Sequence, residues 1–536
     1  MKRLLLLLLL PAFFSCGNDK NSNDENTETP DSLKTEEKFK VLDSENISRD
    51  SLWAPFESDL AEFSEEKYEA VKPLIYDKNI PEIQDAIKNG DLTYEELSLF
   101  YLYRIKEFDR ENELSLNSVI SLNPNLLEEA RQKDEELKNS EDNHLITGIP
   151  VLLKDNINTK GIPTTAGAIA LQDNQTDDAF IVQKLKENGA LILGKANLSE
   201  WAYFFCGDCP SGYSAIGGQT LNPYGRKIFD TGGSSSGSAV AVTANLAPVA
   251  IGSETSGSIL SPSSQNSVVG LKPTIGNLSR GGIVPISSHL DTPGPITKSV
   301  VDNAILYSAM TGLDPEDALS VEVEKTDFNF ENTGLEGKRF GAFKQLMEED
   351  SLYNRAVNDL KSAGAEIVEF EAEEIQLDNF RSLLSLDMKK DLPEYFEQYG
   401  GETGFTSVED VVKFNIEDST RRMPYGQALF EGILKESDST DLESLKSELM
   451  EKGRKYFNRP IKEHNLDGIL SINNYHAGFA AAAHYPAITV PMGYSEEGAP
   501  KGLTFIAKSS EEEKLYQWAF AYEKASNRRQ SPKNYE

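Results

Sequence analysis

"TGGSSSGSAVAVTANLAPVAIGSETSGSILSPSS", from Thr231 to Ser264, is the stretch that decides the fold. Its middle predicts a buried helix over "SGSAVAV" followed by a buried strand over "APVAIGSE". A serine-rich loop precedes the helix and a second one follows the strand. Gly232 and Gly233 give the first loop backbone conformations that other residues avoid. Loops of this kind suit either a solvent-facing linker or a nucleophile held on a tight backbone.

The same alternation of helix and strand extends outward along the chain. "GIPVLLKDN" predicts a buried strand that ends at Lys154, and "AFIVQKLKENGALILGKAN" predicts a helix and a further strand. Upstream, Thr93 and Glu96 form a capping box at the start of a helix, after a helix that Gly90 stops. Residues 325–460 carry long charged helical stretches, and "LDGILSINN" and "YPAITVPMGY" predict late strands. This alternation predicts an α/β fold.

The chain is strongly acidic. Its 536 residues include 53 Lys and Arg against 87 Asp and Glu, a formal net charge of −34. A surface of this charge repels phosphate backbones, so nucleic acid is not an expected partner.

The N-terminus has the features of an export signal. Residues 1–15 combine two basic residues with an apolar run too short to span a bilayer, which is typical of a signal peptide. "FFSC" resembles the lipobox of bacterial lipoproteins, which implies lipidation of Cys16; an ordinary cleaved signal is the alternative. Residues 16–50 are polar and acidic and predict a flexible tether. The expected location is the cell envelope (periplasm or outer membrane), with membrane attachment through the lipid.

Cys206 and Cys209 form a C-x-x-C pair in "CGDCPSG". Zinc would require about four ligands, and neither a second cysteine pair nor a nearby histidine supplies them. A thioredoxin-like context for redox chemistry is also lacking. A local disulfide or two free thiols is the expectation.

Two features of the motifs point to acyl-transfer chemistry. The first is Lys154 at the end of a predicted buried strand. A lysine is rarely fully buried unless it forms an ion pair or has a function, and burial favours its neutral amine, which is a base. Ser258 in "ETSGS" is a candidate nucleophile, with the N–H groups of Thr255, Ser256, Gly257 and Ser258 placed to hold an oxyanion. The Gly-Gly loop lacks the lysine of a phosphate-binding loop, and no G-x-S-x-G elbow supports a Ser-His-Asp triad.

"GIPVLLKDN", "GGSSSGSAVAV" and "GSETSGSILSPSSQNSVVGLKPTIG" together resemble the amidase signature family, and "SETSGSILSPSS" and "DTPGPITKSV" are most similar to its peptide amidase branch. The resemblance covers most of residues 75–530. It implies one large α/β body over residues 51–536, a mixed twisted central sheet flanked by helices. Its parts are N-terminal helices (51–145), a signature core (146–310), and a helical insertion with the C-terminal part (311–536).

The resemblance also implies a Ser-cisSer-Lys triad and neither metal nor cofactor. Lys154 matches the family's general base, Ser234 its bridging serine and Ser258 its nucleophile, with a cis peptide bond between Gly233 and Ser234. The expected activity is hydrolysis of peptide C-terminal amides or small amides through an acyl-enzyme. The alternatives are a non-catalytic exported amide-binding protein and an amidotransferase-type subunit.

This sequence departs from the peptide amidase pattern in two places. Ser256 stands where the pattern usually has Asp, which removes a charge beside the predicted nucleophile. "CGDC" occupies a loop that resembles a substrate-facing segment of relatives. The simpler expectation is a loop held together locally by its two cysteines, without contact to the substrate.

Overall fold

The computed structural model describes residues 39–137, 144–323, 330, 333–437 and 439–536. The predicted signal peptide, Cys16 and most of the predicted tether lie outside these residues. Among the described helices, none is both long and apolar enough to cross a bilayer.

Eleven strands of the described chain form one mixed sheet, which confirms the predicted α/β fold. Their order is β1-β3-β2-β6-β8-β7-β12-β13-β11-β9-β10. The parallel neighbours are β2 with β3 and β6, and β9 with β10 and β11. The strands are β1 (Val119–Leu122), β2 (Pro150–Lys154), β3 (Leu191–Ala196), β6 (Val249–Glu254), β7 (Val269–Lys272), β8 (Thr292–Thr297), β9 (Arg339–Phe343), β10 (Glu366–Phe370), β11 (Gly468–Ile472), β12 (Ala487–Tyr494) and β13 (Pro500–Ile506).

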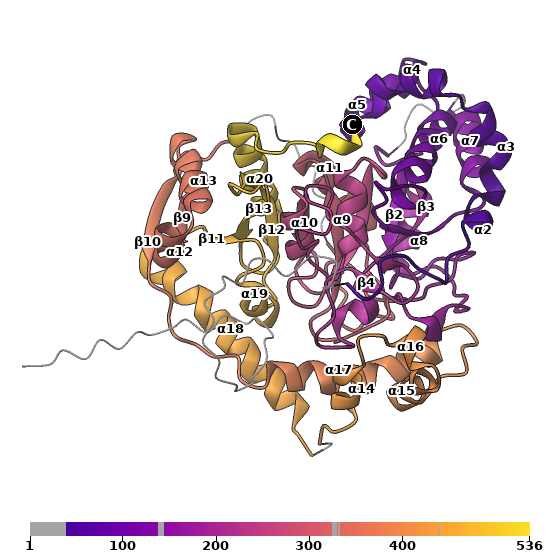
Figure 1. Cartoon of the computed structure of the whole chain (residues 1–536). Coiled ribbons are helices and arrows are strands. Elements are labelled where there is room, and N and C mark those ends of the chain that lie inside the picture. The colour runs from indigo at the N-terminus through magenta and orange to yellow at the C-terminus, as the bar shows by residue number, and fades with distance from the viewer. Residues whose placement is uncertain (1–38, 138–143, 324–329, 331–332, 438) are drawn as a thin grey trace, which may run out of the picture.

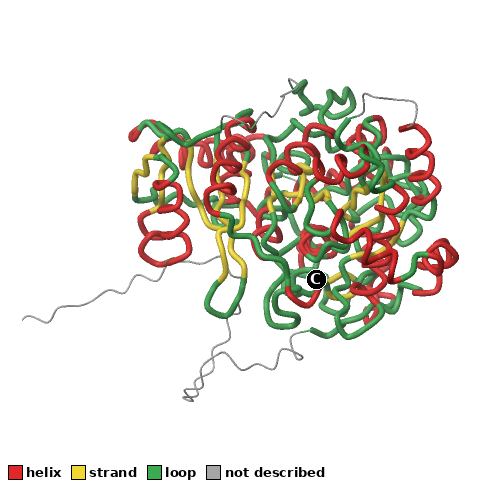
Figure 2. The backbone as a smooth tube through the Cα atoms, turned by 90° about the horizontal axis from the view of Figure 1, so that it is seen from above, coloured by secondary structure: helices red, strands yellow, loops and turns green. Residues whose placement is uncertain are grey.

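Helices cover the sheet and lie along the outside of the molecule, as the view from above shows (Figure 2). The N-terminal helices are α2 (Arg49–Trp53), α3 (Glu57–Glu62), α4 (Glu65–Ile75), α5 (Ile80–Lys88), α6 (Tyr94–Ile105) and α7 (Leu126–Leu137). The central and closing helices are α8 (Phe180–Glu187), α9 (Ser236–Thr243), α10 (Leu260–Gln265), α11 (Val300–Met310) and α20 (Glu512–Ser526). The later helices are α12 (Lys344–Glu349), α13 (Ser351–Ser362), α14 (Phe380–Gln398), α15 (Val408–Glu417), α16 (Ser419–Arg422), α17 (Ala428–Ile433), α18 (Leu442–His464) and α19 (Ala477–Ala483).

The register of the sheet brings the two serine-rich loops to one place. β2 runs parallel to β6, with Leu153 opposite Ile251, so the carboxyl ends of both strands lie side by side. Ligand sites of α/β sheets form at such ends. All five residues of β2 and all six of β6 are buried. The end of β2 therefore carries Lys154 into the interior beside Ser253.

The predicted capping box is present at α6. The Thr93 side chain accepts a hydrogen bond from the N–H of Glu96, and the Glu96 carboxylate accepts from the N–H of Thr93. The prediction was wrong for β9 and β10, which are strands within the stretch expected to be helical. β9 is buried from Phe340 to Phe343, whereas β10 is an edge strand with only Phe370 buried.

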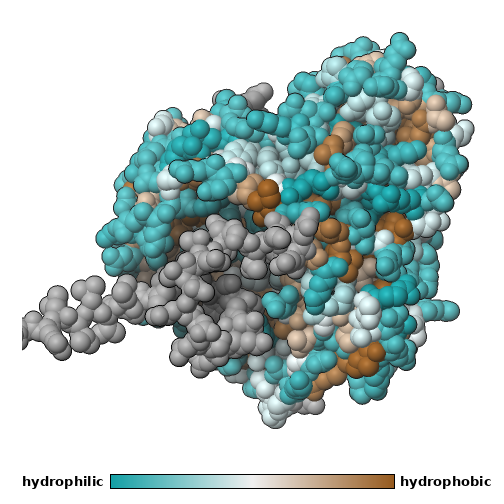
Figure 3. All heavy atoms as spheres, in the orientation of Figure 1, coloured by the Kyte–Doolittle hydropathy of each residue, from teal (hydrophilic) through white to brown (hydrophobic). Residues whose placement is uncertain are grey.

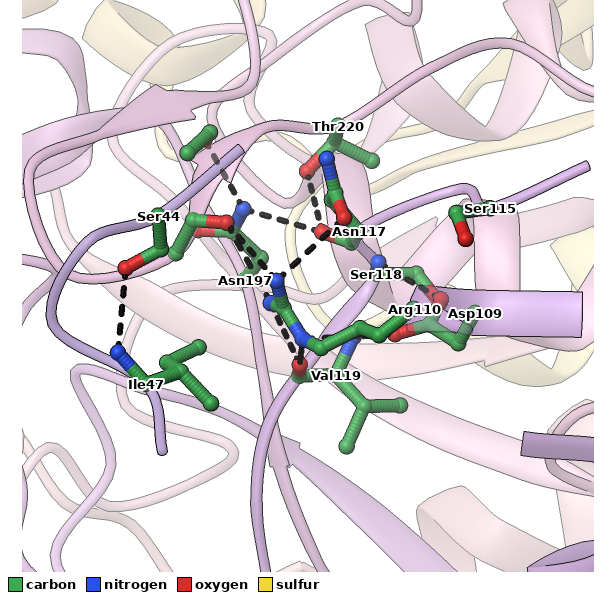
Figure 4. A network of polar contacts seen from close by, with 12 residues as sticks. Ser44, Ile47, Asp109, Arg110, Ser115, Asn117, Ser118, Val119, Asn197 and Thr220 are labelled. Atoms are coloured by element: carbon green, nitrogen blue, oxygen red, sulfur yellow. Dashed lines mark hydrogen bonds and ion pairs between the residues drawn. The ribbon is translucent and has the colours of Figure 1, made fainter. Parts of the chain in front are cut away.

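Residues 39–50 correct the predicted tether, because they pack on the body and do not extend from it. The N–H of Gln219 donates to the carbonyl of Leu42 at 2.9 Å, and Asn117 Nδ2 donates to the same oxygen. The Ser44 hydroxyl accepts from the N–H of Ile47, as Figure 4 shows beside the network around Asn117 and Arg110. The composition is that of a disordered segment, but these backbone groups find partners on the domain.

α14, α15, α16 and α17 lie together along one edge of the molecule, at the bottom of Figure 1. The face seen in Figure 3 is largely hydrophilic, with hydrophobic residues scattered over it. This surface agrees with the share of charged residues in the chain, which is 26%.

Candidate active site

Lys154 is the most unusual side chain at the ends of these strands. It is fully buried, and its Nζ lies 2.7 Å from Ser234 Oγ, 2.9 Å from Ser253 Oγ and 3.0 Å from the carbonyl oxygen of Ser253. Burial in low dielectric lowers the pKa of Lys154 from 10.5 to about 7, although the nearby Asp291 and Glu254 carboxylates act in the opposite direction. A neutral amine is therefore accessible at physiological pH.

Ser253 directs the amine toward Ser234. A neutral amine has two hydrogens and one lone pair, and Ser253 offers two acceptors, its carbonyl and its hydroxyl oxygen. The hydroxyl of Ser253 is held in turn by Asn156 Nδ2, which donates to it at 2.9 Å. When both hydrogens of the amine go to Ser253, the lone pair of Lys154 is directed at the Ser234 hydroxyl. Ser253 and Asn156 were not predicted as site residues.

The three consecutive serines at the start of α9 make different hydrogen bonds. Ser234 contacts Lys154, and its carbonyl oxygen accepts from the N–H of Ser199 at 3.0 Å. Ser235 Oγ donates to the carbonyl of Ser253, while Ser236 Oγ donates to the carbonyl of Gly232. The peptide bond between Gly233 and Ser234 is cis.

Ser258 lies on the loop between β6 and α10 and is 9% exposed. Its carbonyl oxygen accepts from the N–H of Ser235 at 3.1 Å, which joins the two serine-rich loops directly. Over the described part of the chain, no hydrogen bond joins the hydroxyls of Ser234 and Ser258. The loops are adjacent, and the hydroxyl of Ser258 keeps its freedom to rotate.

The Glu254 carboxylate holds this loop in shape. Its Oε1 accepts from the N–H of Gly257 at 2.7 Å, and its Oε2 accepts from the N–H groups of Ile259 and Leu260 at 2.7 and 2.9 Å. Gly257 has a φ of +90°, and a Cβ there would meet Asn474 Nδ2 at 2.8 Å, so only glycine fits without strain. The sequence signal for Glu254 was an acidic residue at the end of a buried strand.

The role of Glu254 changes the predicted set of oxyanion donors. The N–H of Gly257 is already engaged, so it is not available to a substrate. Within the described residues, the N–H groups of Thr255, Ser256 and Ser258 have no hydrogen-bond acceptor. These three N–H groups remain available as hydrogen-bond donors to the oxyanion of a substrate.

We expect Glu254→Ala to lower kcat by about 10²–10³-fold, because the donor loop would lose its shape. Three buried N–H groups would also lose their acceptor, so the melting temperature should fall. Measuring kcat, KM and thermal unfolding for Glu254→Ala and for the isosteric Glu254→Gln checks this. Gln keeps one acceptor oxygen, so it should lie between Ala and the unchanged protein. An unchanged kcat in Glu254→Ala would contradict the assignment.

Ser256 faces the start of α19. A Cβ built on Gly478 would lie 3.7 Å from Ser256 Oγ. Ser256 is partly exposed, in contrast to the buried Glu254 and Thr255 on the same loop.

Cys206 and Cys209 form a disulfide, and both are buried. The carbonyl of Phe205 accepts from the N–H of Leu429, so this loop packs against α17. Neither cysteine is among the described residues that line the two cavities near the site.

A cavity of about 330 Å³ opens beside the donor loop, and Asn156, Ser253 and Thr255 line it. The Thr255 hydroxyl donates to Asp291 at 2.5 Å across its wall. A larger hollow of about 810 Å³ shares Arg280 and other wall residues with it. The arrangement provides a buried base, a bridging hydroxyl, a candidate nucleophile, free N–H donors and room for a ligand.

Comparison with known proteins identifies the class of protein to which this site belongs. Residues 96–471 match the family model described as Amidase. A probable amidase of Arabidopsis thaliana is 36% identical over 491 residues, covering 86% of this chain and 92% of that protein. A glutamyl-tRNA(Gln) amidotransferase subunit of Thermoanaerobacter pseudethanolicus is 31% identical over 490 residues, covering 84% and 97%. The chain belongs to the amidase family, and it is a hydrolytic amidase.

The similar solved structures include a peptide amidase. An amidase family protein from Bacillus anthracis has a TM-score of 0.87 at 37% identity, covering 92% of this chain and 99% of that one. The native peptide amidase of Stenotrophomonas maltophilia has a TM-score of 0.80 at 36% identity, covering 85% and 98%. The resemblance to the amidase signature family, with peptide amidases among the similar structures, is confirmed.

Proposed function

We propose that this chain is a serine amidohydrolase that cleaves C-terminal amides of peptides or other small amides, with Ser258 as nucleophile, Ser234 as proton bridge and Lys154 as base. The observation that carries the proposal is the 2.7 Å contact of a buried, easily deprotonated Lys154 with Ser234. The similarity to peptide amidases supports the choice of substrate class.

In the first half of the reaction, the Ser258 oxygen attacks the carbonyl carbon of the amide. Its proton passes to Ser234 Oγ, whose own proton passes to the lone pair of Lys154. The carbonyl oxygen becomes an anion, and the N–H groups of Thr255, Ser256 and Ser258 stabilise it. The proton then returns through Ser234 to the leaving nitrogen, the carbon–nitrogen bond breaks, and ammonia or an amine departs.

The second half repeats these steps with water. The acyl group remains as an ester on Ser258, and Lys154 takes a proton from water through Ser234. The resulting hydroxide attacks the ester carbon, and Ser258 leaves with the proton. Every proton that Lys154 takes is given back, so the cycle needs only groups that the chain itself supplies.

The direct test is ammonia release from C-terminally amidated dipeptides by the purified protein alone. The proposal expects release of one ammonia per amide, and no cleavage of the same dipeptides as free acids. An activity that appears only with tRNA and a partner protein would contradict it and favour the amidotransferase reading. Amide binding without any turnover or acylation would favour the non-catalytic reading.

We also propose that the protein is exported and anchored through Cys16, which rests on the signal-like residues 1–15 and the lipobox-like "FFSC". Cells grown with labelled palmitate should incorporate label into the protein, and Cys16→Ser should abolish the label. Cys206→Ser is the matched control, because its thiol is in a disulfide far along the chain. A soluble, unlabelled and uncleaved protein would contradict the proposal.

A further inference from the structure

Asp391, on α14, is a buried carboxylate that the reaction above does not use. It is 4% exposed, and its Oδ2 accepts from the N–H of Ser288 at 2.6 Å. Its Oδ1 has no hydrogen-bond partner among the described residues. Leaving a buried carboxylate oxygen unpaired is costly, so such an atom calls for a ligand that supplies a donor.

Asp391 lines the same 330 Å³ cavity as Ser253 and Thr255. A short series of contacts joins the two walls. Thr255 donates to Asp291, which also accepts from the N–H of Ser287, and the next residue, Ser288, donates to Asp391. Asp391 therefore lines the same cavity as Thr255, one of the predicted oxyanion donors.

Apart from the exposed carboxylate of Glu316, the other charged groups of this cavity are ion-paired or hydrogen-bonded. Arg280 forms an ion pair with Asp317, and Lys390 lies 3.8 Å from Glu394. The second oxygen of Asp291 accepts two N–H groups of its own loop. Burial raises the pKa of Asp391 to about 6, so its carboxylate is charged at neutral pH. The unmatched charge of the cavity is negative.

The cavity also offers an unused side-chain donor. Arg280 Nη1 is buried and has no hydrogen-bond partner in the described chain. A ligand with a protonated amine and a carbonyl oxygen satisfies both Asp391 and Arg280. An aliphatic acyl group satisfies neither.

We propose that this cavity receives a protonated amine of the substrate's acyl portion, and that Asp391 is the binding residue that selects it. The inference rests on the proposed amidase function and names its substrate class, cationic peptide amides. The amine belongs either to a free N-terminus or to a basic side chain, and both have the same chemistry.

Two pairs of substrates distinguish these sources. N-acetyl-lysinamide against N-acetyl-norleucinamide tests the side chain, and glycyl-leucinamide against N-acetyl-glycyl-leucinamide tests the N-terminus. For the unchanged protein, we expect kcat/KM to favour the cationic member of at least one pair by about 10–100-fold, the range of a hydrogen bond to a charged group. In Asp391→Asn this ratio should fall to about one, because Asn keeps the shape and loses the charge.

Glu394→Gln is the matched control, since it removes an exposed carboxylate from the same cavity. It should leave both ratios unchanged. The neutral substrates report on folding, because their turnover by Asp391→Asn shows that the variant still has an assembled catalytic site. If Asp391→Asn fails to fold, as judged by loss of its thermal transition, Asp391→Glu serves instead, and it should keep a preference for the cation.

The result that overturns the inference is a ratio near one for both pairs in the unchanged protein, or a ratio that Asp391→Asn leaves intact. A failure of the catalytic proposal is separable from this result. Dissociation constants measured with the Ser258→Ala protein, with and without Asp391→Asn, give the same ratios without turnover. Tighter binding of the cationic amides that depends on Asp391 supports the inference, and equal binding of all four amides refutes it.

Discussion

Ser258→Ala is expected to lower kcat for amide hydrolysis by at least about 10⁴-fold, the scale of loss on removing a serine nucleophile. Alanine has no oxygen with which to form the acyl-enzyme. The fold should survive, because the Ser258 hydroxyl makes no hydrogen bond within the described residues. The measurements are ammonia release and the mass of the protein after treatment with a fluorophosphonate. The mass of the unchanged protein should increase by the mass of the label, and the mass of Ser258→Ala should not change.

Ser256→Ala is the matched control for this experiment. Ser256 lies two residues away on the same loop, and its backbone N–H survives the change. Its labelling by the fluorophosphonate should be unchanged. If Ser258→Ala were still labelled or active, the nucleophile would have to be another group, and the proposed mechanism would be wrong.

Lys154→Met is expected to lower kcat by about 10³-fold or more, because no base would remain for the proton of Ser234. Methionine has a similar length, and it removes an amine whose charged form is disfavoured at this buried position. The carbonyl of Ser253 would keep a partner, since Ser235 Oγ also donates to it at 3.1 Å. We therefore expect little loss of thermal stability. The measurement is kcat alongside thermal unfolding.

Lys272→Met provides the contrast. Lys272 is also fully buried, and burial lowers its pKa to about 8, but its Nζ donates to the carbonyls of Pro273 and Tyr485. Its removal leaves two buried carbonyls unsatisfied, so it should lower the melting temperature and leave kcat nearly intact. Equal losses of activity in the two variants would mean that Lys154 acts through packing and not as a base.

The sequence predicted those parts of the molecule that local patterns specify. The capping box at Thr93 and Glu96, the strand that ends at Lys154, and the helix after Ser234 all follow from periodicity and caps over a few residues. The placing of Ser234 and Ser258 relative to Lys154 came from the family resemblance. The register between β2 and β6 brings these segments together in the structure.

What the sequence did not reveal depends on distant packing. Asp391 lies more than one hundred residues from Thr255, and only the folded chain brings both to one cavity. The use of the Gly257 N–H by Glu254 follows from how tightly the loop turns, which the letters "ETSGS" do not specify. Residues 39–50 have the composition of a tether, yet Leu42 and Ser44 bind backbone groups of the domain. Composition describes an average and misses such specific partners.

The central claim is that Lys154 acts as a neutral base, and the pH dependence of fluorophosphonate acylation at Ser258 tests it most directly. Because the pKa of Lys154 in the folded protein is lowered to about 7, the amine is protonated and inactive below that pH and free above it. The acylation rate should rise about tenfold per pH unit up to about pH 7 and then level off. A rate that is independent of pH between 5 and 9, or one that still rises tenfold per unit at pH 9, would contradict the account.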